Sequence, residues 1–179
     1  IKSYDARINI NLKKVKLLLD IKNLSLKIQT KDPVVVFDDK EIKIKKISSN
    51  ISLKSYFKND FGIKTLSISI KENKVKDLLY TIRSIKNSPR LLITSHLIKN
   101  GKIKGSIDLE FDKYGKIKSD YNINGIIEDG KLQIFNFDTY DKIKFKFKYK
   151  SKNLKIQNLE FNLDNIKFNS DKIEIKNVN

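Results

Sequence analysis

The chain has 179 residues, which is enough for one domain with a hydrophobic core. Hydrophobic residues make up 39% and charged residues 33%, and the two alternate too regularly for a disordered chain. The absence of cysteine excludes disulfides, thiolate zinc sites and cysteine nucleophiles.

The formal net charge is +17, and 35 of the 38 basic residues are Lys. Nucleic-acid-binding proteins rely on Arg for bidentate contacts, whereas here Lys is spread evenly among many Ile and Asn residues. These three residue types have A/T-rich codons, so a low-GC genome explains part of the bias. We therefore expect no nucleic-acid partner. A basic all-β module that binds nucleic acid or another polyanion remains the alternative.

The chain contains no Met, so we expect it to be part of a longer protein. Its longest apolar runs, Leu17–Leu19 and Val34–Phe37, are far shorter than the roughly 20 residues that span a bilayer.

The N-terminal part of the chain alternates apolar and polar residues, which is typical of strands. The pattern predicts strands over Asp5–Leu12, over Val15–Ile28 with one change of phase between Ile21 and Leu24, and over Val34–Phe37. Turns are expected at Asp32-Pro33 and at Asp38-Asp39.

A one-residue change of phase recurs later in the chain. Ile44 is followed by Ile47, Ile63 by Leu66, and Ile156 by Leu159. One extra residue would turn the side chains to the other face unless a β-bulge or a bend absorbs it. The repeated slips therefore predict a strongly curved sheet.

The middle of the chain changes to a helical period. Apolar residues at helical spacing predict an amphipathic helix over Val75–Ile85, with Asn73 as its N-cap. Ser88-Pro89 ends this helix and predicts a second, short one over Arg90–Ile98, which Gly101 would end.

After Gly101 the chain is predicted to be strand to its end, with hairpin turns at Asp112–Gly115 and Glu128–Gly130. Two short strands are expected last, the first with Ile166 and Phe168 and the second from Ile173 to Val178. The predicted fold is mainly β: a long, curved, groove-like antiparallel sheet with a helical insertion around residues 74–99. We expect one module over residues 1–179, with strands in 1–72, the insertion in 73–100 and strands in 101–179.

No residue cluster indicates catalysis. His96 is the one His, so it cannot build a zinc site without further ligands, and its neighbour Ser95 does not make a triad by adjacency. The paired carboxylates Asp38-Asp39 and Glu128-Asp129 are expected to be turn residues. Gly105 and Gly125 fall inside strands, where Gly marks a bulge or a close approach. We therefore expect no enzyme, cofactor or metal, and an envelope hydrolase that uses His96 is the rival.

The remaining feature is an apolar sheet face. Lys142–Lys150 shows it most clearly, because Ile and aromatic residues alternate there with Lys. The sheet either folds over on itself or leaves part of this face for another partner, since the helix at Val75–Ile85 can cover only a few strands. The candidate residues of the face are Ile107, Leu109, Phe111, Tyr121, Ile123, Ile143, Phe145, Phe147, Tyr149, Leu159, Phe161 and Leu163.

The segment KVKDLLYTIRSIKNSP and, after a short link, KNGKIKGSIDLEFDKYGKIKSDYNINGIIEDGKLQIF resemble the AsmA-like proteins of Gram-negative envelopes. The shared marks are the helix before a Gly-Lys-Ile-Lys-Gly strand, the Phe-Asp-x-x-Gly hairpin, the mid-strand Gly125 and the Glu-Asp-Gly motif. The resemblance covers residues 42–178.

The resemblance implies a periplasmic protein. Such a protein is anchored in the inner membrane by an N-terminal transmembrane helix, which would lie outside this chain. It also implies a long β-sheet, folded like a taco, whose apolar groove carries phospholipid acyl chains toward the outer membrane. The expected partners are phospholipid, the inner membrane and neighbouring β modules of the parent protein.

Overall fold

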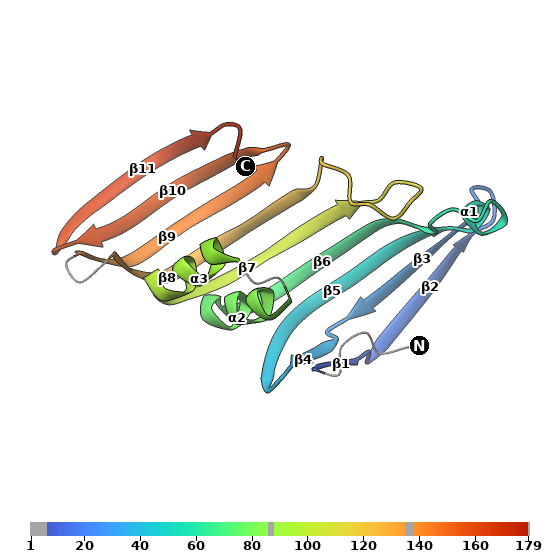
Figure 1. The fold of residues 1–179 in the computed structure, drawn as a ribbon, viewed down its shortest axis with the longest axis horizontal. Coiled ribbons are helices and arrows are strands. Elements are labelled where there is room, and N and C mark those ends of the chain that lie inside the picture. The colour runs from blue at the N-terminus through green and yellow to red at the C-terminus, as the bar shows by residue number, and fades with distance from the viewer. Residues whose placement is uncertain (1–6, 86–87, 135–137, 179) are drawn as a thin grey trace. The chain divides into compact units, whose positions relative to one another are not determined.

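The computed structural model describes residues 7–85, 88–134 and 138–178 (Figure 1). These residues form eleven strands and three helices. The strands are β1 (Ile8–Asn11), β2 (Lys14–Asp20), β3 (Ser25–Lys31), β4 (Val34–Phe37), β5 (Lys40–Ser52), β6 (Ile63–Lys74), β7 (Ile98–Glu110), β8 (Asn122–Ile134), β9 (Asp138–Lys150), β10 (Asn153–Leu163) and β11 (Ile166–Ile175). The helices are α1 (Leu53–Phe57), α2 (Val75–Ile85) and α3 (Pro89–Leu97).

The strands belong to one open antiparallel sheet. Its order is β1-β4-β5-β6-β7-β8-β9-β10-β11, and β3 pairs with β5 while β2 pairs with β3. The predicted fold class is confirmed: the protein is mainly β, and α2 and α3 interrupt the strands within residues 75–97.

The chain divides into two compact units that are not continuous in sequence. The described residues of the first unit are 7–70 and 106–123. Those of the second are 71–85, 88–105, 124–134 and 138–178.

The first unit is built on the long strand β5. Its first part pairs with β4 and its later part with β3, so that both short strands lie along the same neighbour. Asp38-Asp39 forms the predicted turn between β4 and β5. Phe37, Ile42 and Ile44 are the large apolar side chains that are buried in the described part of the chain. All three belong to this unit, whose core is therefore small.

The predicted changes of phase coincide with irregularities in strand pairing. The register of β5 against β6 shifts between Ile44 and Lys46 and again between Asn50 and Ile51. The register of β10 against β9 shifts after Gln157, where Asn158 adopts a φ of 52°. Each extra residue is absorbed by the backbone, so the apolar residues on its two sides stay on one face.

The second unit ends in a meander of β9, β10 and β11 (Figure 1). Two-residue turns join the strands, and all four turn residues, Ser151, Lys152, Asp164 and Asn165, have positive φ. Positive φ at both central positions defines the type I′ turn, whose twist matches that of antiparallel strands. Short turns between consecutive strands therefore set the strand pairing of the meander.

Both predicted helices are present. α2 spans Val75–Ile85 as expected, and α3 has Ser88 as its N-cap, whose Oγ accepts a hydrogen bond from Leu91 N at 3.3 Å. Two boundary predictions were wrong. Asn73 lies inside β6, and α3 ends at Leu97 with Ile98 as its C-cap, because β7 has already begun when the chain reaches Gly101.

Three predicted strand boundaries were also wrong. The slip between Ile21 and Leu24 is a turn between β2 and β3, closed by hydrogen bonds from the backbone N and the Nδ2 of Asn23 to the Asp20 carboxylate. Glu128–Gly130 is not a turn but part of β8, in which Asp129 has a φ of 52°. The last two strands are one, β11, because its pairing with β10 keeps a constant register.

Candidate functional site: the apolar faces of the two units

Strand β9 has one apolar and one basic face. Ile143, Phe145, Phe147 and Tyr149 are half-buried, whereas the Lys residues from Lys142 to Lys150 that alternate with them are exposed. The predicted two-sided strand is therefore present.

Seven of the predicted face residues come together in the second unit. Cross-strand partners lie on the same face of a sheet. Tyr149 pairs with Leu154 and Phe147 with Ile156, which extends the apolar face from β9 to β10. The seven residues are Ile143, Phe145, Phe147, Tyr149, Leu159, Phe161 and Leu163, and all of them are half-buried.

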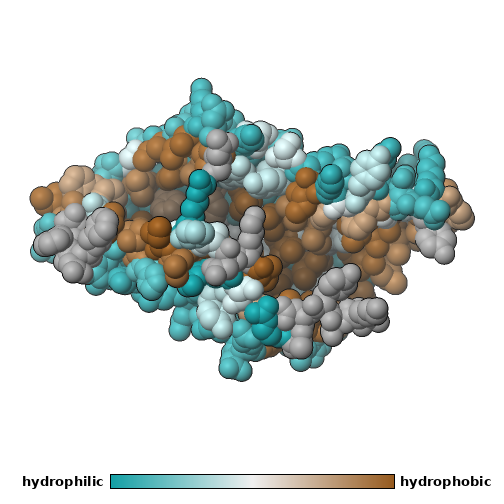
Figure 2. Space-filling model, viewed as in Figure 1, coloured by the Kyte–Doolittle hydropathy of each residue, from teal (hydrophilic) through white to brown (hydrophobic). Residues whose placement is uncertain are grey.

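Aromatic rings make contacts along this face. The ring centroids of Phe145 and Phe147 lie 6.2 Å apart. Phe161 lies 5.1 Å from Phe168 in a stacked arrangement and 5.8 Å from Tyr140. Figure 2 shows that hydrophobic residues gather on the face of the strands turned toward the viewer.

This face also contains residues that were not among the predicted candidates. Leu154 and Ile156 pair with Ile175 and Ile173 across β10 and β11, and Phe161 pairs with Phe168. The alternation within β10 and β11 could have identified these residues.

Two glycines, Gly105 and Gly125, allow atoms of neighbouring strands to approach the backbone closely, as predicted. A Cβ on Gly125 would lie 2.7 Å from Lys104 O and 2.8 Å from Phe147 Cζ. A Cβ on Gly105 would clash with Asn124 O. Because no side chain stands at position 125, the ring of Phe147 can lie across β8. An aromatic side chain that covers a strand Gly in this way stabilises the pairing.

A small apolar hollow opens on this face. It has a volume of about 110 Å³ and is lined by Val75, Ile98, Asn100, Ile127, Gly130, Lys131, Leu132, Ile143 and Phe145. Pockets for drug-sized ligands measure roughly 300–1,000 Å³. The hollow can therefore hold a few carbon atoms, and a longer ligand would have to lie on the open face beside it.

The helices cover only part of the second unit. Val75, at the start of α2, lines the hollow. Further along, Ile82 and Ile85 are exposed, as are Leu92 and Ile93 of α3. A sheet is normally covered by a second layer that buries its apolar face. In the described part of this unit, no large apolar side chain is fully buried.

The other five predicted residues lie in the first unit. Ile107 and Leu109 belong to β7, and Phe111 forms an isolated bridge with Ile117. Tyr121 lies just before β8, and Ile123 lies at its start. All five, which are Ile107, Leu109, Phe111, Tyr121 and Ile123, are half-buried. The ring of Phe111 lies 5.6 Å from that of Phe61.

Further apolar side chains of the first unit are more exposed than the predicted ones. Val15, Leu17 and Leu19 of β2 have exposed fractions of 51%, 60% and 60%. They lie on β2, which among the described strands pairs only with β3. Single exposed apolar residues are ordinary, but a row of them marks an interaction surface.

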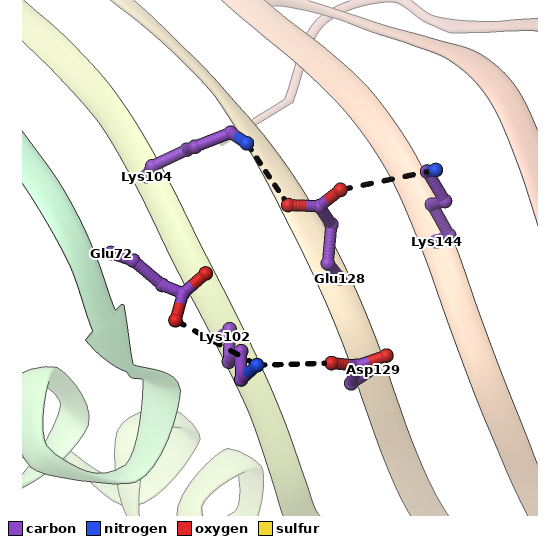
Figure 3. A network of polar contacts seen from close by, with 6 residues as sticks. All are labelled: Glu72, Lys102, Lys104, Glu128, Asp129 and Lys144. Carbon is purple, nitrogen blue, oxygen red and sulfur yellow. Dashed lines mark hydrogen bonds and ion pairs between the residues drawn. The ribbon is translucent and has the colours of Figure 1, made fainter.

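The basic face of the second unit contains an ion-pair network (Figure 3). Lys102 Nζ lies 3.3 Å from Asp129 and 3.7 Å from Glu72, and Glu128 lies 3.0 Å from Lys104. The hydrogen bond to Asp129, followed by the charge of Glu72, raises the pKa of Lys102 above its ordinary value. Glu128 also lies 3.8 Å from Lys144, at the centre of β9.

Ser95 and His96 lie in the last turns of α3, and Glu128 and Asp129 lie in β8. Ser95 Oγ donates to Leu92 O at 2.7 Å and accepts from Arg83 Nη1 at 2.9 Å, while His96 is exposed in the last turn of α3. Glu128 and Asp129 are ion-paired strand residues. Among the described residues, no group of His, Cys, Asp and Glu could hold a metal ion.

No helix within the described ranges is long and apolar enough to cross a membrane. Comparisons of the chain with protein-family models, curated proteins and solved structures found no match.

Proposed function

We propose that this chain is a non-enzymatic module of the AsmA-like type. Its apolar sheet faces would hold phospholipid acyl chains between the inner and outer membranes of a Gram-negative envelope. The observation that supports this most strongly is that all twelve predicted face residues are half-buried and none is fully buried. An apolar face of this kind, left without a complete second layer, is suited to bind an apolar partner.

The length of the face suits an acyl chain. Strands rise about 3.3 Å per residue, so the row from Ile143 to Tyr149 is about 20 Å long. The hydrocarbon core of a bilayer is about 30 Å thick, and one leaflet therefore about 15 Å. A single acyl chain could lie along this row without leaving the apolar surface.

The energetics favour weak binding of low selectivity. A sixteen-carbon chain that hides half of its surface from water gains about 6 kcal/mol, at about 0.8 kcal/mol per methylene group. An acyl chain that moves from a bilayer to this face loses a similar amount of free energy, because the half of its surface that points away from the sheet becomes exposed to water. Neighbouring β modules of the parent protein, which we propose as partners, would reduce this cost by covering the outer side.

The proposed location follows from the same reasoning. A conduit between two membranes works in the periplasm, and it needs attachment to the inner membrane through a segment outside this chain. The exposed Lys residues would assist only near anionic head groups.

The alternative is a module that binds nucleic acid or another polyanion through the basic face. The exposed Lys row of β9 favours it. However, proteins that bind single-stranded nucleic acid stack bases on aromatic side chains, and Phe145, Phe147 and Tyr149 lie on the opposite face from the Lys row.

A lipid crosslinking experiment with matched variants tests the proposal. Phe145→Asp with Phe147→Asp places two charges on the apolar face, and we expect it to abolish crosslinking of a photoactivatable phospholipid to the protein. Lys144→Gln with Lys146→Gln alters the opposite face of the same strand and should leave crosslinking nearly unchanged. Circular dichroism confirms that the strands persist in both variants. If only the Lys variant loses crosslinking, or if the native protein captures no lipid, the proposal is wrong.

A further inference from the structure

The basic face carries a second hollow, at the hairpin between β9 and β10. It has a volume of about 250 Å³ and is lined by Lys148, Lys150, Ser151, Asn153 and Lys155. Lys148 pairs with Lys155 and Lys150 with Asn153, so these side chains share one face of two neighbouring strands. The Lys148–Tyr149–Lys150 alternation places this hollow on the face opposite to the apolar one.

Among the described residues, two of the lysines at this hollow lack the carboxylate partners that some other lysines of the basic face have. Lys144 and Lys167 have carboxylate partners, Glu128 at 3.8 Å and Glu160 at 3.1 Å. Within the described part of the chain, neither Lys148 nor Lys150 has an ion-pair partner.

Lys155 adds a third positive charge to this hollow and is only partly neutralised. It lies 3.1 Å from Glu174, which also binds Lys172 at 2.9 Å and so serves two cations. Like charges directly opposite each other destabilise a strand pair, and Lys148 stands opposite Lys155. An anion between the ammonium groups would remove this repulsion.

We propose that the hollow at the β9–β10 hairpin binds a phosphate-bearing anion, either the head group of an anionic phospholipid or a free phosphate compound. Lys148, Lys150 and Lys155 supply ammonium donors, and Asn153 supplies an amide donor. The site is a compact cluster at the end of a hairpin, without an aromatic side chain among its lining residues. A phosphate group therefore fits it better than a single-stranded nucleic acid, which needs stacking surfaces.

This site does not depend on the proposed function of the apolar face, because it lies on the opposite side of the same strands. Phe145→Asp with Phe147→Asp should leave phosphate binding unchanged. A failure of the lipid conduit and a failure of the anion site are therefore distinguishable.

Binding is measured for the 179-residue chain with two probes: pyrophosphate in solution, and vesicles of phosphatidylcholine with and without phosphatidylglycerol. The site variant is Lys148→Gln with Lys150→Gln. The control is Lys144→Gln with Lys167→Gln, which removes the same charge from the same face where carboxylate partners are present. We expect the site variant to lose about fivefold in affinity for each Lys removed, and the control to stay within about twofold of the native protein.

Binding of both probes identifies a site for any phosphate compound, and binding of anionic vesicles alone identifies a head-group site. Equal losses in the two variants would show diffuse attraction to net charge and would overturn the proposal. So would the absence of binding to both probes, or a preference for a single-stranded oligonucleotide over vesicles at equal phosphate concentration.

Discussion

Gly125 shows how one residue without a side chain supports the candidate face. The space where its Cβ would stand is occupied by the carbonyl oxygen of Lys104 and the ring of Phe147. The ring can move, but the carbonyl oxygen belongs to a paired strand and cannot move without disturbing the sheet. The glycine therefore sets both the distance between neighbouring strands and the position of an aromatic ring.

We predict that Gly125→Ala destabilises the protein by about 1–3 kcal/mol, the usual cost of overpacking. Gly62→Ala is the matched control, because the nearest atom to its Cβ would be Ile51 Cγ2 at 3.5 Å, an ordinary contact. Urea unfolding followed by circular dichroism measures both changes. Equal midpoints for the two variants would contradict the close approach at Gly125.

The pKa of Glu174 provides a test of the ion pairs on the basic face. Hydrogen bonds from Lys172, followed by Lys155, hold the pKa of its carboxyl below the ordinary value of 4.5. Because the pKa is lower in the folded than in the unfolded state, the resulting stability is present above the unfolded pKa. It is lost as the pH falls through the folded pKa. The carboxyl is exposed to solvent, so salt weakens the effect.

We predict that a carboxyl NMR titration at low salt finds Glu174 below 4.5, and that Lys172→Gln raises this pKa. Lys167→Gln, which removes the partner of Glu160 instead, should not change it. A Glu174 titration that is the same in the native protein and in Lys172→Gln would refute the assigned ion pair.

Whole strands show which structural features can be predicted from a hydrophobic pattern. The slips at Ile44 and Ile156 were predicted to be absorbed by bulges or bends, and register shifts are found at both. The slip between Ile21 and Leu24 has the same local appearance but is a turn. A turn and a bulge can both account for extra residues in an alternating pattern. After a bulge the chain continues along the same neighbouring strand, whereas after a turn it runs back beside the strand it has just left. The local sequence does not contain this information about strand pairing.

The bulge at Asn158 gives a prediction about β10. Its φ of 52° lies in the left-handed region, where a residue with a branched side chain costs about 1–2 kcal/mol. We expect Asn158→Val to lower the free energy of unfolding by this amount, and Asn158→Gly to have little effect. Asn169→Val, a substitution on neighbouring β11 where φ is not positive, is the control. Equal destabilisation by the two Val substitutions would contradict the bulge.

The protein as a whole has more alternating strand than its helices cover. The sequence was sufficient to predict the sheet, the helical insertion and the two-sided character of β9, because each follows from local periodicity. The sequence left open whether the sheet folds over on itself and covers its own apolar face. Burial depends on whether a second layer exists, and a strand has the same alternating pattern in either case. The half-buried state of Phe147 and Phe161, and the exposure of Leu17, could be found only in the structure.

The most direct test of the proposed lipid-binding face uses a photoreactive amino acid, placed singly at each position from 143 to 147 in the full-length protein. After irradiation in cells, lipid attached to the protein is identified by mass spectrometry. Positions 143, 145 and 147 lie on the apolar face of β9, whereas 144 and 146 lie on the basic face. We predict lipid attached at the three odd positions and none at the two even ones. Lipid at the even positions, or no lipid at any of the five, would contradict the proposal that this face holds acyl chains.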